Sequence, residues 1–89
     1  MLQLTENAIE MIQTLTAEAD LPEGGLRIAQ EQEHPGLSME LTPAPRAQDY
    51  VLPMQGVRLF LDAVAATRLQ GQTLDARSNE TGSAFFLDA

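Results

Sequence analysis

The fold is decided by residues 56–76, which read GVRLFLDAVAATRLQGQTLDA. The apolar run Val57–Leu61 indicates a strand, and Asp62 directly after it is a favourable N-cap for a short helix over Ala63–Leu69. Gly71 marks the end of that helix, because glycine readily adopts the left-handed conformation that follows a helix. A strand pattern then resumes. The stretch therefore predicts strand, short helix and strand joined by tight connections.

Upstream of this stretch, a first helix is predicted from a capping residue and an apolar stripe. Thr5 is a good N-cap, and the alternating Met1–Leu4 before it is a candidate edge strand. The stripe recurs at helical spacing with glutamates between its members; it consists of Ala8, Ile9, Met11, Ile12, Leu15 and Ala19. Pro22 and the glycines after it end the helix. We expect a helix over Thr5–Ala19 whose stripe packs in the core; a partner surface is the alternative use of such a stripe.

Three pairs of strands are predicted from alternation with period two and from turn residues between the runs. The pairs are Leu26–Ile28 with Leu37–Leu41, Tyr50–Leu52 with Val57–Leu61, and Thr73–Ala76 with Ala84–Leu87. The turns between them are 31–36, 53–56 and 78–82. The expected fold class is mainly β (α+β). Residues 1–89 would form a single domain, a compact β-sandwich with one N-terminal helix and one short helix.

Charge and composition exclude several function classes. The chain has 13 acidic residues and 5 arginines, with no lysine, for a formal net charge of −8. Nucleic acid and anionic membrane surfaces would be repelled, so we expect neither as a partner. The absence of lysine excludes Schiff-base and P-loop chemistry. No apolar run approaches a membrane span and no signal peptide is evident, so a cytoplasmic location is expected.

Several stretches carry a resemblance to a known family. They are Gly25-Leu26-Arg27-Ile28, Asp49-Tyr50-Val51, residues 56–62 and residues 69–75. On these the chain resembles the A-type iron–sulfur carriers of the HesB/IscA family, whose element order is also the one predicted here. Members of that family hold an iron–sulfur cluster, or iron, through three cysteines. The matching residues are packing and turn patterns, so the resemblance implies the fold more directly than the activity.

The cluster ligands of that family are missing. Its first cysteine lies in a Gly-Cys-Ser/Ala-Gly turn after the Gly-Leu-Arg strand, where this chain has His34-Pro35-Gly36. The other two belong to a Cys-Gly-Cys tail beyond the last strand, and the 89 residues contain no cysteine. A thiolate-held cluster needs about four sulfur ligands, with histidine as an occasional substitute. One histidine cannot replace them, so we expect no cofactor and no cluster carriage by the family's mechanism.

Glu31, Glu33 and His34 are the candidate metal ligands, because they lie in the turn that corresponds to the family's ligand loop. Two carboxylates and one histidine have precedent in non-haem iron sites. The simpler interpretation, which we expect, is a solvated acidic turn with one exposed histidine. Ser38 is the nearest hydroxyl nucleophile to His34, but it alternates with apolar strand residues and lies in no nucleophile motif. We therefore expect that the protein is not an enzyme.

Two functional hypotheses follow. In the first, the protein is a non-catalytic interaction or regulatory module related to iron–sulfur cluster assembly, which keeps the family's protein-binding surface. In the second, it is a weak iron or divalent-metal binder through the Glu31/Glu33/His34 loop. Stoichiometric metal in the purified protein would separate the two. The identity of the protein partner is open. Exposed sheet edges without lysine also favour self-association, so a homodimer is a further candidate state.

Overall fold

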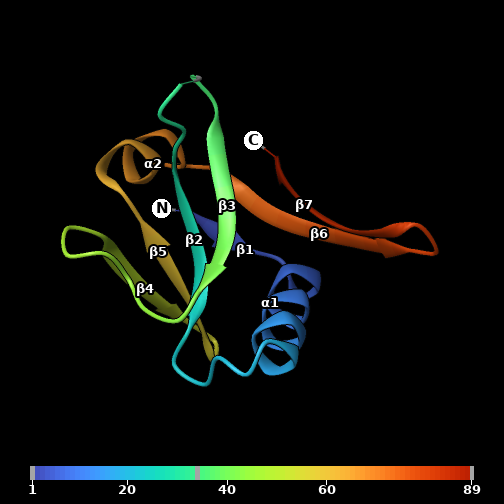
Figure 1. Ribbon diagram of the computed structural model, residues 1–89. Helices are drawn as coiled ribbons and strands as arrows, with labels where there is room; N and C mark the ends of the chain where they lie inside the picture. Colours follow the sequence, from blue (N-terminus) through green and yellow to red (C-terminus); the bar gives the residue numbers. More distant parts are fainter. Residues whose placement is uncertain (1, 34, 89) are drawn as a thin grey trace.

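The computed structural model describes residues 2–33 and 35–88, and its elements follow the predicted order (Figure 1). In chain order they are β1 (Gln3–Leu4), α1 (Glu6–Glu18), β2 (Gly25–Gln30), β3 (Leu37–Thr42), β4 (Tyr50–Met54), β5 (Val57–Leu61), α2 (Ala63–Arg68), β6 (Thr73–Asn79) and β7 (Gly82–Asp88). These form two mixed sheets, ordered β1-β6-β7 and β3-β2-β5-β4. The predicted mainly β fold with an N-terminal helix and a short helix is confirmed. Neither helix within the described residues is long and apolar enough to cross a membrane.

Thr5 begins α1 and also fastens the helix to β6. Its Oγ1 accepts a hydrogen bond from the backbone N–H of Ala8 at 3.1 Å, which makes it the predicted N-cap. The same hydroxyl donates to Oδ1 of Asp75 at 2.6 Å. That hydrogen bond, with a second from the backbone N–H of Ala76, lowers the pKa of Asp75. One threonine side chain therefore sets both where the helix starts and which strand it lies against.

The core is formed where α1 and the two sheets face one another. Its buried members are aliphatic: Leu2, Ala8, Ile9, Ile12, Leu26, Ile28, Val57, Leu59, Leu61, Ala65, Leu69, Leu74 and Ala76. On α1 only the first half of the predicted stripe is buried, at Ala8, Ile9 and Ile12. Met11 and Leu15 are half-buried and Ala19 is exposed. The C-terminal half of the helix therefore presents apolar surface that the core does not cover.

The opposite face of the four-stranded sheet holds a shielded ion pair. Arg27 of β2 lies in register with Phe60 of β5, which is 1% exposed. The Arg27 guanidinium donates to both carboxylate oxygens of Asp49, at 2.8 and 3.0 Å. The two side chains are 11% and 3% exposed. These hydrogen bonds lower the pKa of Asp49 and raise that of Arg27. The connection from β3 to β4 is thereby tied to the centre of the sheet.

The turn between β4 and β5 is tighter than predicted. Strand β4 continues through Pro53 to Met54, so the connection is the two-residue turn Gln55-Gly56. Both turn residues have positive φ, 51° and 86°, as a type I′ hairpin turn requires. The sequence predicts a four-residue turn over 53–56, which begins with proline and ends with glycine. Proline is tolerated here because β4 is an edge strand and needs donors on one side only.

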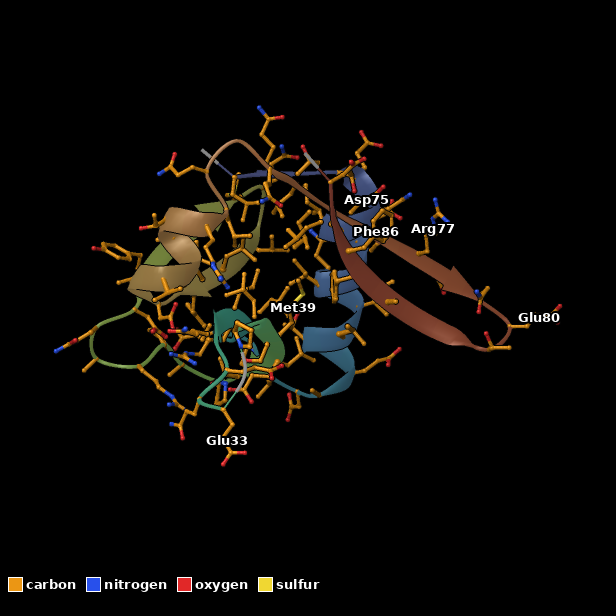
Figure 2. The ribbon with its side chains drawn as sticks, turned by 90° about the horizontal axis from the view of Figure 1, so that it is seen from above. Glu33, Met39, Asp75, Arg77, Glu80 and Phe86 are labelled. Carbon is orange, nitrogen blue, oxygen red and sulfur yellow. The ribbon has the colours of Figure 1, made fainter. Side chains whose placement is uncertain are left out.

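The hairpin of β6 and β7 is longer than predicted. It includes Ser78 and Asn79 on β6 and Gly82 and Ser83 on β7, which were assigned to the turn or its edge. The turn is closed by Asn79, whose Oδ1 accepts from the N–H and hydroxyl of Thr81 at 2.9 and 2.7 Å. The outer half of the hairpin projects beyond α1 (Figure 1), and Glu80 lies at its outer end (Figure 2). Polar residues suit strands there because both faces meet solvent.

Two strand pairs were not predicted, and both are parallel. Strand β1 pairs with β6, and β2 pairs with β5. The second pair explains Gly25: a Cβ at this position would lie 2.3 Å from the carbonyl oxygen of Arg58. A glycine is therefore required for the close approach of the two strands. Parallel partners are far apart in sequence, so local patterns carry no signal for them.

Candidate functional site

The turn 31–36 connects β2 to β3 and is fastened at two points. The backbone N–H of Glu31 donates to the carbonyl of Gly36 at 3.0 Å, which closes the turn on itself. The guanidinium of Arg68, in the last turn of α2, donates to the carbonyl of Pro35. The turn is thus held by its own backbone and by the neighbouring helix α2.

Asp62 fixes the base of the same turn. Its Oδ1 accepts from the N–H of Ala65 at 2.8 Å, which confirms the predicted N-cap of α2. Its Oδ2 accepts from the N–H of Gln30, the last residue of β2, at 3.0 Å. This second hydrogen bond was not predicted, because Gln30 is distant in sequence. Both oxygens of Asp62 accept from backbone donors, so its carboxylate has a structural role at the junction of β2 and α2.

Two of the predicted metal ligands, Glu31 and Glu33, lie within the described residues. A surface hollow of about 430 Å³ lies over the turn, lined by Gln30, Glu31, Gln32, Glu33, Pro35 and Asp62. Glu31 is half-buried, whereas Glu33 is exposed and points away from the body of the molecule (Figure 2). Residues 2–33 and 35–88 contain no group of three His, Cys, Asp or Glu side chains that could hold a metal. His34 lies outside the described residues, so the Glu31, Glu33 and His34 site stays a prediction.

Ser38 is integrated in the β2–β3 ladder. The residue is half-buried, and its hydroxyl donates to the carbonyl of Ala29 at 3.3 Å. This hydrogen bond gives the hydroxyl a role within the sheet, in agreement with the interpretation of Ser38 as a strand residue.

A second surface, which sequence reasoning did not single out, lies between α1 and the hairpin of β6 and β7. We call it the α1–hairpin groove. Its volume is about 680 Å³, and it is lined by Asn7, Glu10, Met11, Thr14, Leu15, Glu18, Ala76, Arg77, Ser78, Asn79 and Ser83. The sequence feature that could have indicated this groove is the apolar stripe on α1, which extends beyond the part of the helix that is buried in the core. The other wall of the groove could not be expected, because the hairpin of β6 and β7 was predicted to be shorter than it is.

Comparison with known proteins places the chain in context. No family model matches it. A protein of Cereibacter sphaeroides, described as an uncharacterized protein in the nifU 5′ region, is 32% identical to the chain over 93 residues. The alignment covers 99% of the chain and 86% of that protein.

Solved structures with the same fold include three that match almost the whole chain. A protein from Aquifex aeolicus, solved by solution NMR, has a TM-score of 0.80 at 21% identity and covers 99% of this chain and 90% of its own. SufA of Escherichia coli, described as involved in the biosynthesis of iron–sulfur clusters, has a TM-score of 0.78 at 24% identity, with 98% and 83% coverage. IscA with a 2Fe–2S cluster has a TM-score of 0.70 at 21% identity, with 99% and 84% coverage.

These matches define the class of protein. The chain belongs to the same family as the Cereibacter sphaeroides protein, to which it is related along nearly its whole length. It has the fold of the HesB/IscA-like proteins, and its 89 residues contain no cysteine. The fold that the sequence resemblance implied is thereby confirmed.

Proposed function

We propose that the protein is a non-catalytic interaction or regulatory module related to iron–sulfur cluster assembly. One observation carries the proposal: the HesB/IscA fold extends over the whole described chain, while the sequence contains no cysteine. A cluster of the family's kind needs thiolate ligands, and these are absent. The surfaces by which such a fold contacts other proteins do not depend on thiols, so they can persist without the cluster.

The relatives support the choice of process. SufA is described as involved in the biosynthesis of iron–sulfur clusters, IscA was solved with a 2Fe–2S cluster, and the Cereibacter relative is described by its position in the 5′ region of nifU. We extend that process to this chain as part of the proposal. The acidic charge of −8 favours protein partners over nucleic acid or anionic membranes, and we propose a cytoplasmic site of action.

The fastened turn at 31–36 further supports a role without a cluster. Its backbone is closed by the Glu31–Gly36 hydrogen bond, and Arg68 binds the carbonyl of Pro35. Both contacts are made within the chain, and neither depends on a bound metal. The turn therefore contributes to the stability of the module.

Anaerobic reconstitution with iron and sulfide tests the chemical half of the proposal. The protein should emerge from desalting without a visible absorption band near roughly 400 nm, where thiolate-ligated clusters absorb. A cysteine-containing HesB/IscA protein treated in parallel is the positive control. A band that stays with the cysteine-free chain would refute the proposal.

Affinity capture tests the interaction half. The tagged chain, expressed at its native level in the organism of origin, should enrich one or more iron–sulfur assembly proteins or client apoproteins relative to the tag alone. Quantitative mass spectrometry gives the enrichment. Failure to enrich any such protein would contradict the module.

Self-association is a further element of the proposal. Strands β3, β4 and β7 are edges of the two sheets, and the sequence has no lysine to discourage pairing between edges. Sedimentation velocity over a range of concentrations gives the mass of the particle in solution. A mass of one chain at all concentrations would exclude the homodimer and leave the interaction module intact.

A further inference from the structure

The α1 wall of the α1–hairpin groove combines an apolar row with an acidic row. Met11 and Leu15 lie one helical turn apart and are half-buried. Glu10, Thr14 and Glu18 follow the same spacing on the adjacent row, because residues four apart share one face of a helix. A ligand lying along this wall would meet aliphatic carbon and carboxylate oxygen side by side.

The hairpin wall is polar and largely uncharged. Ser78 and Ser83 face each other across the strands, with their hydroxyl oxygens 3.4 Å apart. Arg77 also lines the groove, but its guanidinium lies over the ring of Phe86, 5.1 Å from the centroid, and the two are seen together on the hairpin in Figure 2. The basic group of the groove is thus engaged by an aromatic ring of the neighbouring strand β7. The carboxylates of α1 dominate the charge.

Glu10 and Glu18 have no hydrogen-bond or ion-pair partner within residues 2–33 and 35–88. Glu18 is moreover in the last turn of α1, where no basic residue accompanies it. The helix dipole disfavours a negative charge at that end. The fold therefore gains no hydrogen bond or ion pair from these two carboxylates, and a cationic ligand would complement both.

We propose that the α1–hairpin groove binds a short, extended segment of a partner protein in which lysine or arginine alternates with aliphatic residues. The inference rests on the proposed function, to which it adds a binding surface and a partner chemistry. The α1 wall from Asn7 to Glu18 is about 16 Å long at ~1.5 Å per residue. An extended chain of about five residues, at ~3.3 Å each, spans that length.

Charge complementarity selects this occupant over the others. A second copy of the chain also carries −8, so its approach to a wall bearing Glu10 and Glu18 is unfavourable. Nucleic acid is disfavoured for the same reason. A purely apolar segment would leave the two carboxylates to be desolvated without a partner. A segment with both basic and aliphatic residues can pair with Glu10 and Glu18 and cover the apolar row of Met11 and Leu15.

A binding titration with two peptides tests the proposal. The probe is a short fluorescein-labelled peptide in which lysine and valine alternate; its counterpart carries serine in place of valine. Fluorescence anisotropy at low ionic strength should give saturable binding of the first peptide and binding weaker by about threefold or more for the second. Amide chemical shifts in the ¹⁵N-labelled chain should move in residues 7–18 and 76–83. Equal binding of both peptides, or shifts centred elsewhere, would overturn the proposal.

A matched pair of double variants separates groove binding from general attraction to an acidic protein. Glu10→Gln with Glu18→Gln removes two charges from the groove, and Glu23→Gln with Glu40→Gln removes two exposed charges outside it. The first variant should bind the lysine–valine peptide about tenfold more weakly, as for two lost ion pairs. The second should bind within about twofold of the wild type. Equal weakening in both would mean that only net charge attracts the peptide, and the proposal fails.

Separate measurements test whether a second copy of the chain occupies the groove and whether the proposed interaction function is correct. Amide shifts in the groove that depend on protein concentration alone would identify a second copy as the occupant and overturn the proposal. Affinity capture with the Glu10→Gln, Glu18→Gln variant distinguishes the proposed binding groove from the proposed interaction function. If wild type and variant capture assembly proteins equally, the interaction function stands and the groove is not its binding surface. If the peptide binds saturably in the groove but the wild type captures no assembly protein, the groove stands and the interaction function is wrong.

Discussion

The backbone of the β2–β3 turn and the carboxylates of the α1–hairpin groove differ in whether they have partners within the described residues. At the turn, Arg68 binds the carbonyl of Pro35 and Asp62 accepts from the N–H of Gln30. In the groove, the carboxylates of Glu10 and Glu18 have no partner in the described part of the chain. The turn corresponds to the family's ligand loop by sequence resemblance, and the two interactions of Arg68 and Asp62 with it are internal.

The difference indicates where this chain can still bind something. Polar groups that already have good partners contribute to stability and gain little from a ligand, whereas groups without partners gain the full interaction. Removing a polar side chain on the sheet and turn side should therefore lower stability. Removing one in the groove should leave stability intact and change binding.

The largest expected effect is on the sheet side, at Asp49. Replacing Asp49 with Ala leaves Arg27 shielded and without its carboxylate. Loss of one partner of a buried ion pair costs roughly 3–5 kcal/mol. We expect about 3 kcal/mol here, because Arg27 keeps some solvent contact. Urea unfolding followed by circular dichroism measures the loss. The exposed Glu23→Ala is the control and should change stability by less than about 0.5 kcal/mol.

The same carboxylate predicts how stability depends on pH. The pKa of Asp49 lies below its ordinary value of 3.8, chiefly because the Arg27 side chain donates hydrogen bonds to the carboxylate. The stabilisation is present above the unfolded-state pKa and is lost as pH falls through the lower folded-state pKa. The wild type should lose stability below about pH 5, and Asp49→Ala should lose less over that range. Identical pH profiles would contradict the assignment. A residual slope is expected from Asp75, whose pKa is also lowered.

The next largest effect is expected at the base of the turn. Asp62→Ala removes the N-cap of α2 and the acceptor for Gln30. A lost cap costs about 1 kcal/mol and a lost hydrogen bond about another 1 kcal/mol, so the total should be about 2 kcal/mol. Thermal and urea unfolding give the value. A change within about 0.5 kcal/mol would show that the turn is not fastened through this carboxylate.

In the groove, substitution of the carboxylates should raise stability, whereas substitution on the sheet and turn side should lower it. Replacing Glu10 and Glu18 together with Gln should raise stability by about 0.5 kcal/mol, because a carboxylate at the C-terminal end of α1 opposes the helix dipole and the net charge becomes less negative. Urea unfolding at low and high salt measures the gain, which salt should diminish. A loss of more than about 1 kcal/mol would mean that the two glutamates stabilise the fold and would remove the contrast between the regions.

The smallest effect is expected at His34. The sequence predicts a solvated turn, so His34→Ala should change stability by about 0.5 kcal/mol or less. Isothermal titration with iron(II) or zinc should give no stoichiometric, saturable binding. An isotherm that disappears in the His34→Ala variant would instead establish the Glu31, Glu33 and His34 site. It would also mean that the β2–β3 turn binds a ligand, so the turn and the α1–hairpin groove would no longer differ in this respect.

Local features of the fold were predicted from the sequence, and non-local ones were not. Thr5 and Asp62 were identified as helix caps because a cap and the N–H it binds lie three residues apart. The antiparallel pairs were predicted because their strands are adjacent in the chain. The parallel pair of β2 with β5 was not, although Gly25 is required for it. Nothing local indicates which distant strand a glycine must accommodate.

The two candidate sites also differ in whether their residues are close together in the sequence. Glu31, Glu33 and His34 were singled out because they are consecutive or nearly so, which is a sequence property. The α1–hairpin groove joins helix residues near Glu10 with strand residues near Ser78, and it exists because β6 continues past the point where turn residues begin. Asn79 has a high turn propensity, so the extension could not be predicted without the tertiary context that leaves the hairpin in solvent.

The two hydrogen bonds of Asp62 have a consequence for motion. One carboxylate accepts from the N–H of Gln30 at the end of β2 and from the N–H of Ala65 in the first turn of α2. Rotation of that side chain releases both amides together. The amide protons of Gln30 and Ala65 should therefore exchange with deuterium through a shared opening event, with similar protection factors. The strand end and the helix start would then form one cooperative unit, despite the distance between them in the chain.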